Sequence, residues 1–488
     1  MTIAVFTQGS ILRHILVMTG ANTITLLALV GSDLVDMYFL SQLGEQELAA
    51  AIGFSGILLF ILTSVGMGLQ IAVGALVAKA EGQRDRYQAK RLCTHTMLFA
   101  VLVTTLVTIP TWFSLEFLLS LLGARGHTLD LAVNYCRIVT LTAPVLVCGM
   151  CAIAALRAVG DARRSTFATL SAVVVTLILD PLLIIVFEMG IQGAAYTALV
   201  SRVVLMLVGL AVLSGVHRFL VGIDWSALRA DIAAIAAIAG PAMLTTTATP
   251  IGSAYVVNII SAYGDSAVAG AATLERIMPV ALSVIFGLST AVGPIIAQNA
   301  GADRYDRVKK TINQAVWLNI VYVLVIWALL FLLRDVIITT FSAEGEAAYL
   351  ISFSITYLSG FIMFMGMLFI AIAGFNNLSM ASTATMFNLA RVFAGLFPLV
   401  TLGSWWLGSA GVLAGESAAA LLWGSCAFLV LRRRVKRMAK EHAKLTAAAP
   451  VVEDISPMAY SSGVSQMGAA LETSNIQVQR PDNNSEAK

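Results

Sequence analysis

Long apolar runs, each bounded by a short polar segment, recur along the chain as far as residue 431. A helix that crosses a bilayer needs about 20 mostly apolar residues. No competing pattern of alternating apolar and polar residues predicts membrane-spanning strands. We therefore predict an all-α integral membrane protein with twelve transmembrane helices, at 13–40, 48–79, 92–121, 131–156, 165–188, 191–216, 232–262, 267–299, 311–340, 348–373, 381–403 and 408–431.

Basic residues predict how these helices are oriented, because the loops on the cytoplasmic side of a membrane are enriched in Lys and Arg. Of the 30 Lys and Arg residues, 21 fall in five segments that lie on one side of a twelve-span chain. The loops predicted on the other side carry only Arg125 and Arg334. We therefore expect a multi-pass protein of the plasma (inner) membrane with both termini in the cytoplasm. The five basic segments are 79–91, 157–164, 217–229, 301–310 and 432–444.

Composition supports this class of protein. Hydrophobic residues make up 59% of the chain, charged residues 12%, and the mean hydropathy is +0.88. A soluble domain has about 25% charged residues, so a soluble enzyme and a nucleic-acid-binding protein are both excluded. Residues 445–488 are polar and without periodicity, which predicts a disordered cytoplasmic tail.

The chain contains an internal duplication. A shift of 219 residues aligns SVGMGLQIAVGALVAKAEGQRDRYQAK (64–90) with SVIFGLSTAVGPIIAQNAGADRYDRVK (283–309). The repeat therefore holds six spans, and an even number gives both copies the same orientation. We predict two six-helix bundles, 1–220 and 221–440, related by a pseudo-two-fold axis along the membrane normal, as in transporters. Gly82 and Gly301, which the shift aligns, are expected to allow close helix contact and to end helices at the cytoplasmic face.

Acidic residues inside the first bundle are candidates for ion coupling, because ionisable residues in the membrane are costly and are usually functional. Asp33 and Asp36 share one face of the first helix. Asp180 lies 16 residues after Arg164, roughly 24 Å along the fifth helix, and so at a depth similar to theirs. These carboxylates could bind a proton or join the ligands of a sodium ion. The structural alternative is that Asp36 and Asp180 form ion pairs with Arg137 or Arg202.

The second bundle lacks the same acids. The first helices of the two halves align at a shift of 220 residues, at which Ser253 and Val256 match Asp33 and Asp36. Glu275 is the candidate there for contact with a cationic substrate, and Arg202 is a further candidate cavity residue in the first bundle. The sequence contains no G-x-x-x-x-G-K-[ST] phosphate-binding loop, so the energy for transport is expected to come from an ion gradient.

Three stretches carry a family resemblance: LVDMYFLSQLGEQELAAA (34–51), YCRIVTLTAPVLVCGMCAIAALRAVGDARRSTFATLSAVVVTLILDPLLI (135–184) and FGLSTAVGPIIAQNAGA (286–302). They resemble the multidrug and toxic compound extrusion (MATE) family, and within it the prokaryotic branch that includes the DNA-damage-inducible proteins. The resemblance implies two bundles that form a V. It also implies export of organic, mostly cationic amphipathic compounds in exchange for protons or sodium. We also expect a monomer and no cofactor other than the coupling ion.

The resemblance also suggests roles for individual residues. The family's first-helix aspartate falls on Asp36 and its fifth-helix aspartate on Asp180. Thr176 stands where the family often has Asn, and Ala198 stands where it has a sixth-helix Thr, with Thr197 adjacent. The loss of these oxygen ligands favours protons over sodium as the coupling ion.

Two other functions would make different demands on the sequence. A flippase of lipid-linked saccharides, in the same wider superfamily, would need cationic residues in its cavity, and Arg137, Arg202, Arg276 and Arg391 are available. A membrane-embedded enzyme would need a catalytic constellation such as H-E-x-x-H, which the sequence does not contain.

Overall fold

The computed structural model describes residues 4–41 and 46–448 and is helical throughout its regular structure. The chain divides into two units, residues 1–439 and 440–488, and the architecture described below is that of the first, whose last helix continues into the second. In the second unit, Lys440–Ala448 are helical, so the predicted disordered tail is wrong for residues 445–448; residues 449–488 lie outside the described part of the chain.

The first six spans follow a short 3-10 helix, η1 (Val5–Thr7). Several spans are made of more than one helical piece, as in the bent pair α5 and α6, which meet at 47°. The pieces are α1 (Ile11–Ser41), α2 (Gln46–Gly82), α3 (Arg86–Phe113), α4 (Leu115–Leu121), α5 (Gly126–Leu141), α6 (Ala143–Ala158), α7 (Ala162–Asp180), η2 (Pro181–Val186), α8 (Gly190–Ala211) and η3 (Val212–Val216).

The next six spans repeat the plan. They comprise α9 (Trp225–Ser261), α10 (Asp265–Gly301), α11 (Tyr305–Thr340), α12 (Gly345–Phe353), η4 (Ser354–Leu358), η5 (Ser359–Phe361), α13 (Ile362–Asn377), α14 (Ala381–Ala390), η6 (Arg391–Leu396) and α15 (Phe397–Ala448). Ten described helices are long and apolar enough to span a membrane, or eleven with the bent pair. The last of these contains Gly408 at φ 62° and ψ −140°, where one span ends and another begins. The fold is therefore the predicted twelve-span one.

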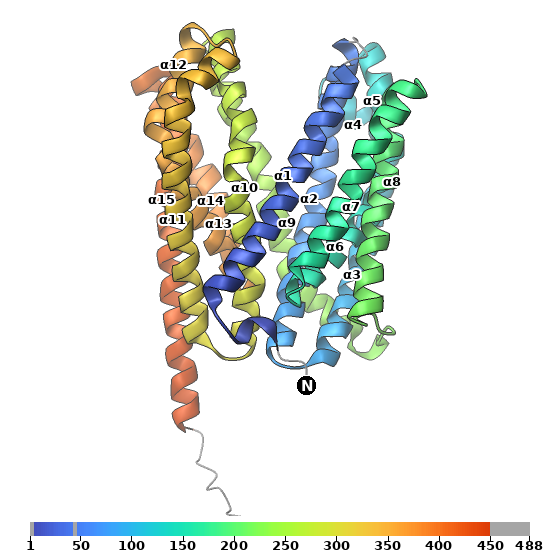
Figure 1. Cartoon of the computed structure of the whole chain (residues 1–488), viewed down its shortest axis with the longest axis vertical. Coiled ribbons are helices and arrows are strands. Elements are labelled where there is room, and N and C mark those ends of the chain that lie inside the picture. The colour runs from blue at the N-terminus through green and yellow to red at the C-terminus, as the bar shows by residue number, and fades with distance from the viewer. Residues whose placement is uncertain (1–3, 42–45, 449–488) are drawn as a thin grey trace, which may run out of the picture. The chain divides into compact units, whose positions relative to one another are not determined.

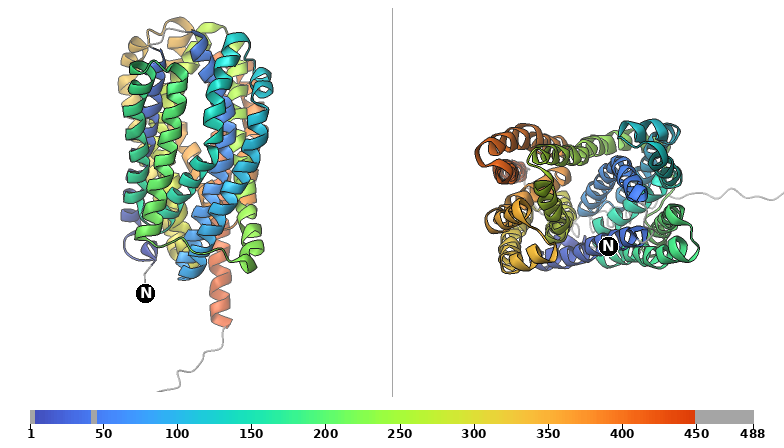
Figure 2. Two further views of the ribbon diagram at one scale, coloured as in Figure 1. Left: turned by 90° about the vertical axis from the view of Figure 1, so that its right-hand side faces the viewer. Right: turned by 90° about the horizontal axis from the view of Figure 1, so that it is seen from above.

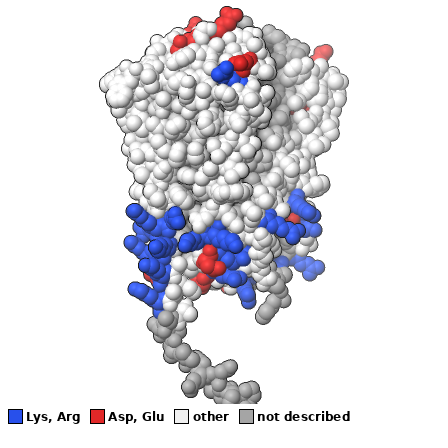
Figure 3. Space-filling model, turned by 60° about the vertical axis from the view of Figure 1, so that its left-hand side comes forward, with Lys and Arg blue, Asp and Glu red and all other residues white. Residues whose placement is uncertain are grey.

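Within the first unit, the two sets of helices form separate groups that contact each other near one end (Figure 1, Figure 2). Lys and Arg gather at this end, below a wide uncharged band (Figure 3). We call it the basic end; it carries the short connections after α2, α6 and α10. The other ends of the two groups diverge in Figure 1.

Two helices cross between the groups. At the basic end, Ile15 and Met18 of α1 pack in a buried cluster with Leu288 and Ile295 of α10. By the same plan, Ile235 of α9 packs in a cluster with residues of α2, α3 and α6. The first helix of each half thus packs against the other half at the basic end, and the duplicated halves make this contact in the same way.

Glycine allows the two groups to meet there. A Cβ atom on Gly82 would overlap the backbone carbonyl of Gln298, and one on Gly301 would overlap that of Lys79. Both glycines end their helices, as predicted. The left-handed residues that follow are Arg84 and Asp303, however, so these glycines serve close helix contact rather than a left-handed cap.

Candidate functional site

A cavity of about 520 Å³ lies inside the first group of helices. Helices α1, α2, α5, α6, α7 and α8 all contribute to its walls. All six residues of the first bundle that the sequence singled out line it: Asp33, Asp36, Thr176, Asp180, Thr197 and Arg202. The structure therefore brings together side chains from three separate spans, α1, α7 and α8.

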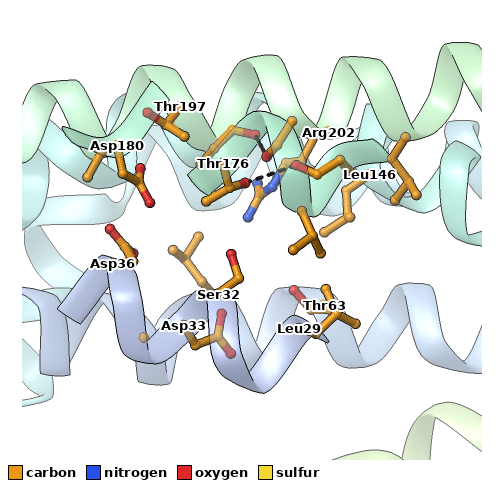
Figure 4. A pocket seen from close by; sticks show the side chains of 18 of the residues that line it. Leu29, Ser32, Asp33, Asp36, Thr63, Leu146, Thr176, Asp180, Thr197 and Arg202 are labelled. Atoms are coloured by element: carbon orange, nitrogen blue, oxygen red, sulfur yellow. Dashed lines mark hydrogen bonds between the residues drawn. The ribbon is translucent and has the colours of Figure 1, made fainter. Parts of the chain in front are cut away.

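Asp36 and Asp180 face each other across this cavity, from α1 and α7 (Figure 4). Asp180 is only 1% exposed and Asp36 is half-buried. One carboxylate oxygen of each, Oδ1 of Asp36 and Oδ2 of Asp180, is buried without a hydrogen-bond partner. Buried polar atoms are normally paired, so two facing unpaired oxygens are the feature expected of a site that takes up a proton or a cation.

Proline places Asp180 at a change in helix geometry. Asp180 is the last residue of α7, and Pro181 begins the π-helical segment η2. Proline has no backbone N–H and its ring collides with the preceding turn, so the regular helix cannot continue through it. Single-turn π segments occur frequently at functional sites. The Asp-Pro pair thus sets the aspartate where the helix widens.

The two threonines supply hydroxyl oxygens near Asp180. Thr197 of α8 is 1% exposed, and its hydroxyl is buried without a partner. Thr176 lies one turn before Asp180 and donates to the carbonyl of Ala172, which leaves its oxygen lone pairs free to accept. Asp33 is exposed to the cavity, one turn before Asp36.

The alternative interpretation, in which Asp36 and Asp180 are neutralised by arginine, is not what the structure shows. Arg202 donates instead to the carbonyl of Val139 and to the hydroxyl of Thr142, at 2.8 and 2.6 Å. Among the described residues no ion pair joins either aspartate to Arg202 or Arg137. Arg202 therefore braces the bend between α5 and α6 while its side chain lines the cavity.

Sequence reasoning missed several polar residues of this cavity. Ser32, Thr63, Tyr135 and Ser201 also line it. Ser32 lies four residues before Asp36, a helical spacing that could have indicated a shared face. The others carried no signal, because hydroxyl residues are common in membrane helices and their facing depends on packing.

A second cavity, of about 550 Å³, occupies the corresponding place in the other group of helices. Ser253 and Val256, which match Asp33 and Asp36, line it together with Glu275 and Glu416. The predicted substrate residue Glu275 is exposed to this space. Across the described residues, no group of three or more His, Cys, Asp or Glu side chains could hold a metal ion.

Comparison with known proteins identifies the family. The model of the MatE family matches the chain twice, at 22–182 and at 241–400, so the second match begins 219 residues after the first. The chain belongs to the MatE family. Its two matches coincide with the internal duplication seen in the sequence.

Curated relatives of this MatE chain are transport and resistance proteins. A Shewanella oneidensis protein named FAD transporter is 31% identical over 434 residues, which cover 86% of this chain and 94% of the relative. A Bacillus subtilis protein named probable multidrug resistance protein YpnP is 26% identical, over 88% of this chain and 96% of the relative. A Staphylococcus saprophyticus multidrug export protein, MepA, is 26% identical, over 69% of this chain and 76% of the relative.

Solved structures of similar fold are also MATE transporters. The Vibrio cholerae transporter VcmN in its bent form has a TM-score of 0.83 at 22% identity and covers 88% of this chain and 98% of its own. A MOP superfamily transporter from Pyrococcus furiosus has a TM-score of 0.83 at 20% identity, over 90% of this chain and 99% of its own. The protein is thus a multi-pass membrane transporter of an efflux family and not an enzyme.

Proposed function

We propose that this MatE protein is a secondary active antiporter of the inner membrane. It exports organic, mostly cationic amphipathic compounds in exchange for protons or sodium, and its basic end faces the cytoplasm. The observation that carries the proposal is the pair Asp36 and Asp180, two facing carboxylates with unpaired buried oxygens in one cavity. The gathering of Lys and Arg at one end supports the orientation.

Protons are the preferred coupling ion. Two carboxylates and the hydroxyls of Thr176 and Thr197 reach the roughly six oxygens that a hard cation usually takes only if each carboxylate binds it through both of its oxygens. A single proton needs only one of the two carboxylates, and the unpaired oxygen of the other can accept its hydrogen bond. Thr197, buried without a partner, would then orient Asp180.

Glu275 of the second cavity is proposed to contact the positive charge of a substrate. It is exposed to a space of about 550 Å³, which lies within the range typical of small-molecule sites, roughly 300–1,000 Å³. The cavity also presents apolar side chains, including Met278 and Phe286. An acid in an apolar cavity suits an amphipathic cation.

The decisive experiment uses proteoliposomes loaded with ethidium, with a pH gradient or a sodium gradient imposed separately. Transport by the wild-type protein under one gradient, and its loss in Asp36→Asn, would support the proposal and identify the ion. The matched control is Asp130→Asn, an exposed aspartate outside both cavities. If Asp36→Asn transports ethidium as fast as the control, the coupling role is wrong.

A second candidate cargo is a flavin nucleotide. The observation that favours it is the relative named FAD transporter, which is 31% identical over 434 residues. Replacing ethidium by riboflavin 5′-phosphate in the same vesicles tests it directly. Gradient-driven movement of the nucleotide but not of ethidium would assign the protein to this cargo.

A further inference from the structure

Arg157, in the LRAVGD stretch near the end of α6, is a cation without a counter-charge. Its Nε atom is buried and has no hydrogen-bond partner. Within the described part of the chain, no ion pair includes Arg157. Arg157 is half-buried, and an unpaired charge that is partly removed from water is destabilising. This position therefore calls for an anion.

The guanidinium borders a cavity of about 170 Å³ between the two groups of helices. We call this space the anion cavity. Gln70 of α2 and Arg157 of α6 line it from the first group, and α10 and α13 line it from the second. Its volume is below the range of drug-sized sites, so it suits a small ion or one chemical group of a larger solute. Polar side chains of the second group that line it are Ser289, Thr290, Asn376 and Asn377.

A second, independent feature points to a ligand here. Asn376 is only 2% exposed, yet its Oδ1 atom has no hydrogen-bond partner. Oδ1 of the neighbouring Asn377 is also buried and unpartnered. A carboxamide can offer an N–H to an anion and an oxygen to a hydroxyl or a water. No Asp or Glu is among the lining residues, so the side chains that line the cavity carry a net positive charge.

We propose that the anion cavity binds a phosphate-type oxyanion, either free inorganic phosphate or the phosphoryl group of a larger solute. Guanidinium groups bind such anions with paired, charge-assisted hydrogen bonds. The unpaired Oδ1 atoms of Asn376 and Asn377 accept from a phosphate hydroxyl or from a bound water. The site is independent of the carboxylate pair Asp36 and Asp180, which lines a different cavity.

Binding at this place has a conformational consequence. The cation comes from the first group of helices and the carboxamides come from the second, so a bound oxyanion links the two. A ligand that binds one conformation better than another shifts the population toward it. The oxyanion therefore stabilises the state in which the groups meet at the basic end.

The test is a thermal-unfolding measurement on the purified full chain in detergent. Potassium phosphate is compared with potassium chloride at equal ionic strength, because a ligand that binds only the folded state raises the unfolding midpoint. We expect phosphate to raise the midpoint of the wild-type protein by several degrees. Arg157→Gln loses this response, and the control Arg163→Gln, an exposed arginine six residues further on, keeps it. An unchanged phosphate response in Arg157→Gln overturns the proposal.

A second variant keeps the test valid if Arg157→Gln does not fold. Asn376→Asp places a carboxylate in the anion cavity, where it can pair with Arg157 in place of the ligand. We expect this variant to unfold at or above the wild-type midpoint in chloride and to gain nothing from phosphate. A phosphate response equal to that of the wild type contradicts the proposal.

The source of the oxyanion is decided by riboflavin and riboflavin 5′-phosphate, which differ only in the phosphoryl group. One outcome is that riboflavin 5′-phosphate raises the unfolding midpoint of the wild-type protein but not that of Arg157→Gln, while equal concentrations of riboflavin and of inorganic phosphate have no effect. In that case the oxyanion is the phosphoryl group of a larger solute. That arm rests on the proposed transport function. If inorganic phosphate is as effective, a free anion fills the cavity. If neither inorganic phosphate nor riboflavin 5′-phosphate raises the unfolding midpoint of the wild-type protein or of Arg163→Gln, the site is refuted. The coupling role of Asp36 is not affected by that result.

Discussion

Gly82 of α2 lies directly against the backbone carbonyl of Gln298 of α10. The pseudo-symmetric contact places Gly301 of α10 against the carbonyl of Lys79 of α2. Each contact admits no Cβ atom, and together they join the two groups of helices at the basic end. A rigid backbone carbonyl, unlike a flexible side chain, cannot move aside to make room.

Gly82→Ala is therefore expected to destabilise the state in which the groups meet at this end. Spin labels at Gln83 and Ala302, introduced in a cysteine-free background, should report a longer and broader distance distribution than in the parent. Gly53→Ala, on the same helix but with no heavy atom within 4 Å of the added Cβ, serves as the control. An unchanged distribution in Gly82→Ala would mean that the close contact does not hold the ends together.

The amino-terminal segment depends on Gln298 as well. The Gln298 side chain accepts from the backbone N–H of Phe6 at 3.0 Å and donates to the carbonyl of Ala158 at 2.7 Å. Phe6 itself is 1% exposed, and its carbonyl accepts from Asn299 and Arg307. One fully buried glutamine thus links η1, α6 and α10.

Gln298→Glu keeps an oxygen that accepts from the backbone N–H of Phe6. It replaces the amide N–H that donates to the carbonyl of Ala158 by a second carboxylate oxygen, which cannot donate. We expect a loss of about 2 kcal/mol or more in the free energy of unfolding, since a buried carbonyl loses its partner and a charge is buried. Denaturant or thermal unfolding in detergent measures it. Gln83→Glu, exposed in the loop after α2, should change stability by no more than a few tenths of that value.

The spans and the acid pair could be predicted from sequence because both depend on local geometry. Apolar length sets a span, and the helical rise per residue sets the depth of Asp36 and Asp180 along their own helices. The doubled sequence likewise predicted two sets of six helices with the same orientation. None of these inferences required knowledge of side-chain packing.

Contacts between helices could not be predicted in the same way. Whether Arg157 has a counter-charge depends on which residues of α10 and α13 face it, and the sequence does not encode helix rotation directly. For the same reason the sequence left open an ion pair of Arg202 with Asp36 or Asp180. The hydrogen-bond partners of Arg202 in the structure are Val139 and Thr142, which lie at a bend. Burial of Phe6 depends on the second group of helices, far away in the sequence.

The connection between the two groups is held by a buried ion network. Asp231 of α9 accepts from Nδ1 of His95 at 2.7 Å and from Nε of Arg91 at 3.0 Å. The backbone N–H of Asp224 donates to Nε2 of His95, so the proton of the neutral imidazole belongs on Nδ1. His95 is fully buried and Asp231 is 6% exposed.

Asp231→Ala should cost about 3 kcal/mol or more, because it leaves a buried imidazole and an arginine without their acceptor. In the double variant with Arg91→Gln the combined loss should be smaller than the sum, as expected for residues in one network. Thermal unfolding of the single and double variants forms the cycle. Strict additivity would show that the two side chains do not interact in solution.

Asp161, in the connection before α7, gives a pH-dependent contribution to stability. Burial acts to raise the pKa of its carboxyl, but hydrogen bonds from Arg164 and His217 outweigh burial and hold the pKa below its ordinary value. A carboxyl whose pKa is lower in the folded state stabilises the protein above its unfolded pKa, about 3.9, and this contribution is lost as the pH falls through the folded value.

Asp161→Asn keeps a capping oxygen for the first turn of α7 but removes the charge that Arg164 and His217 contact. We expect the variant to be less stable than the wild type at pH 7, by on the order of 1 kcal/mol for a partly exposed pair. The difference should shrink as the pH falls below about 4, because the wild-type carboxylate is then neutralised too. Asp85→Asn is the matched control: Asp85 also caps a helix, through the N–H of Gln88, and makes no ion pair among the described residues. A difference between Asp161→Asn and the wild type that stays constant from pH 7 to about 3, the range that spans an ordinary aspartate pKa, would show that the carboxylate charge contributes nothing.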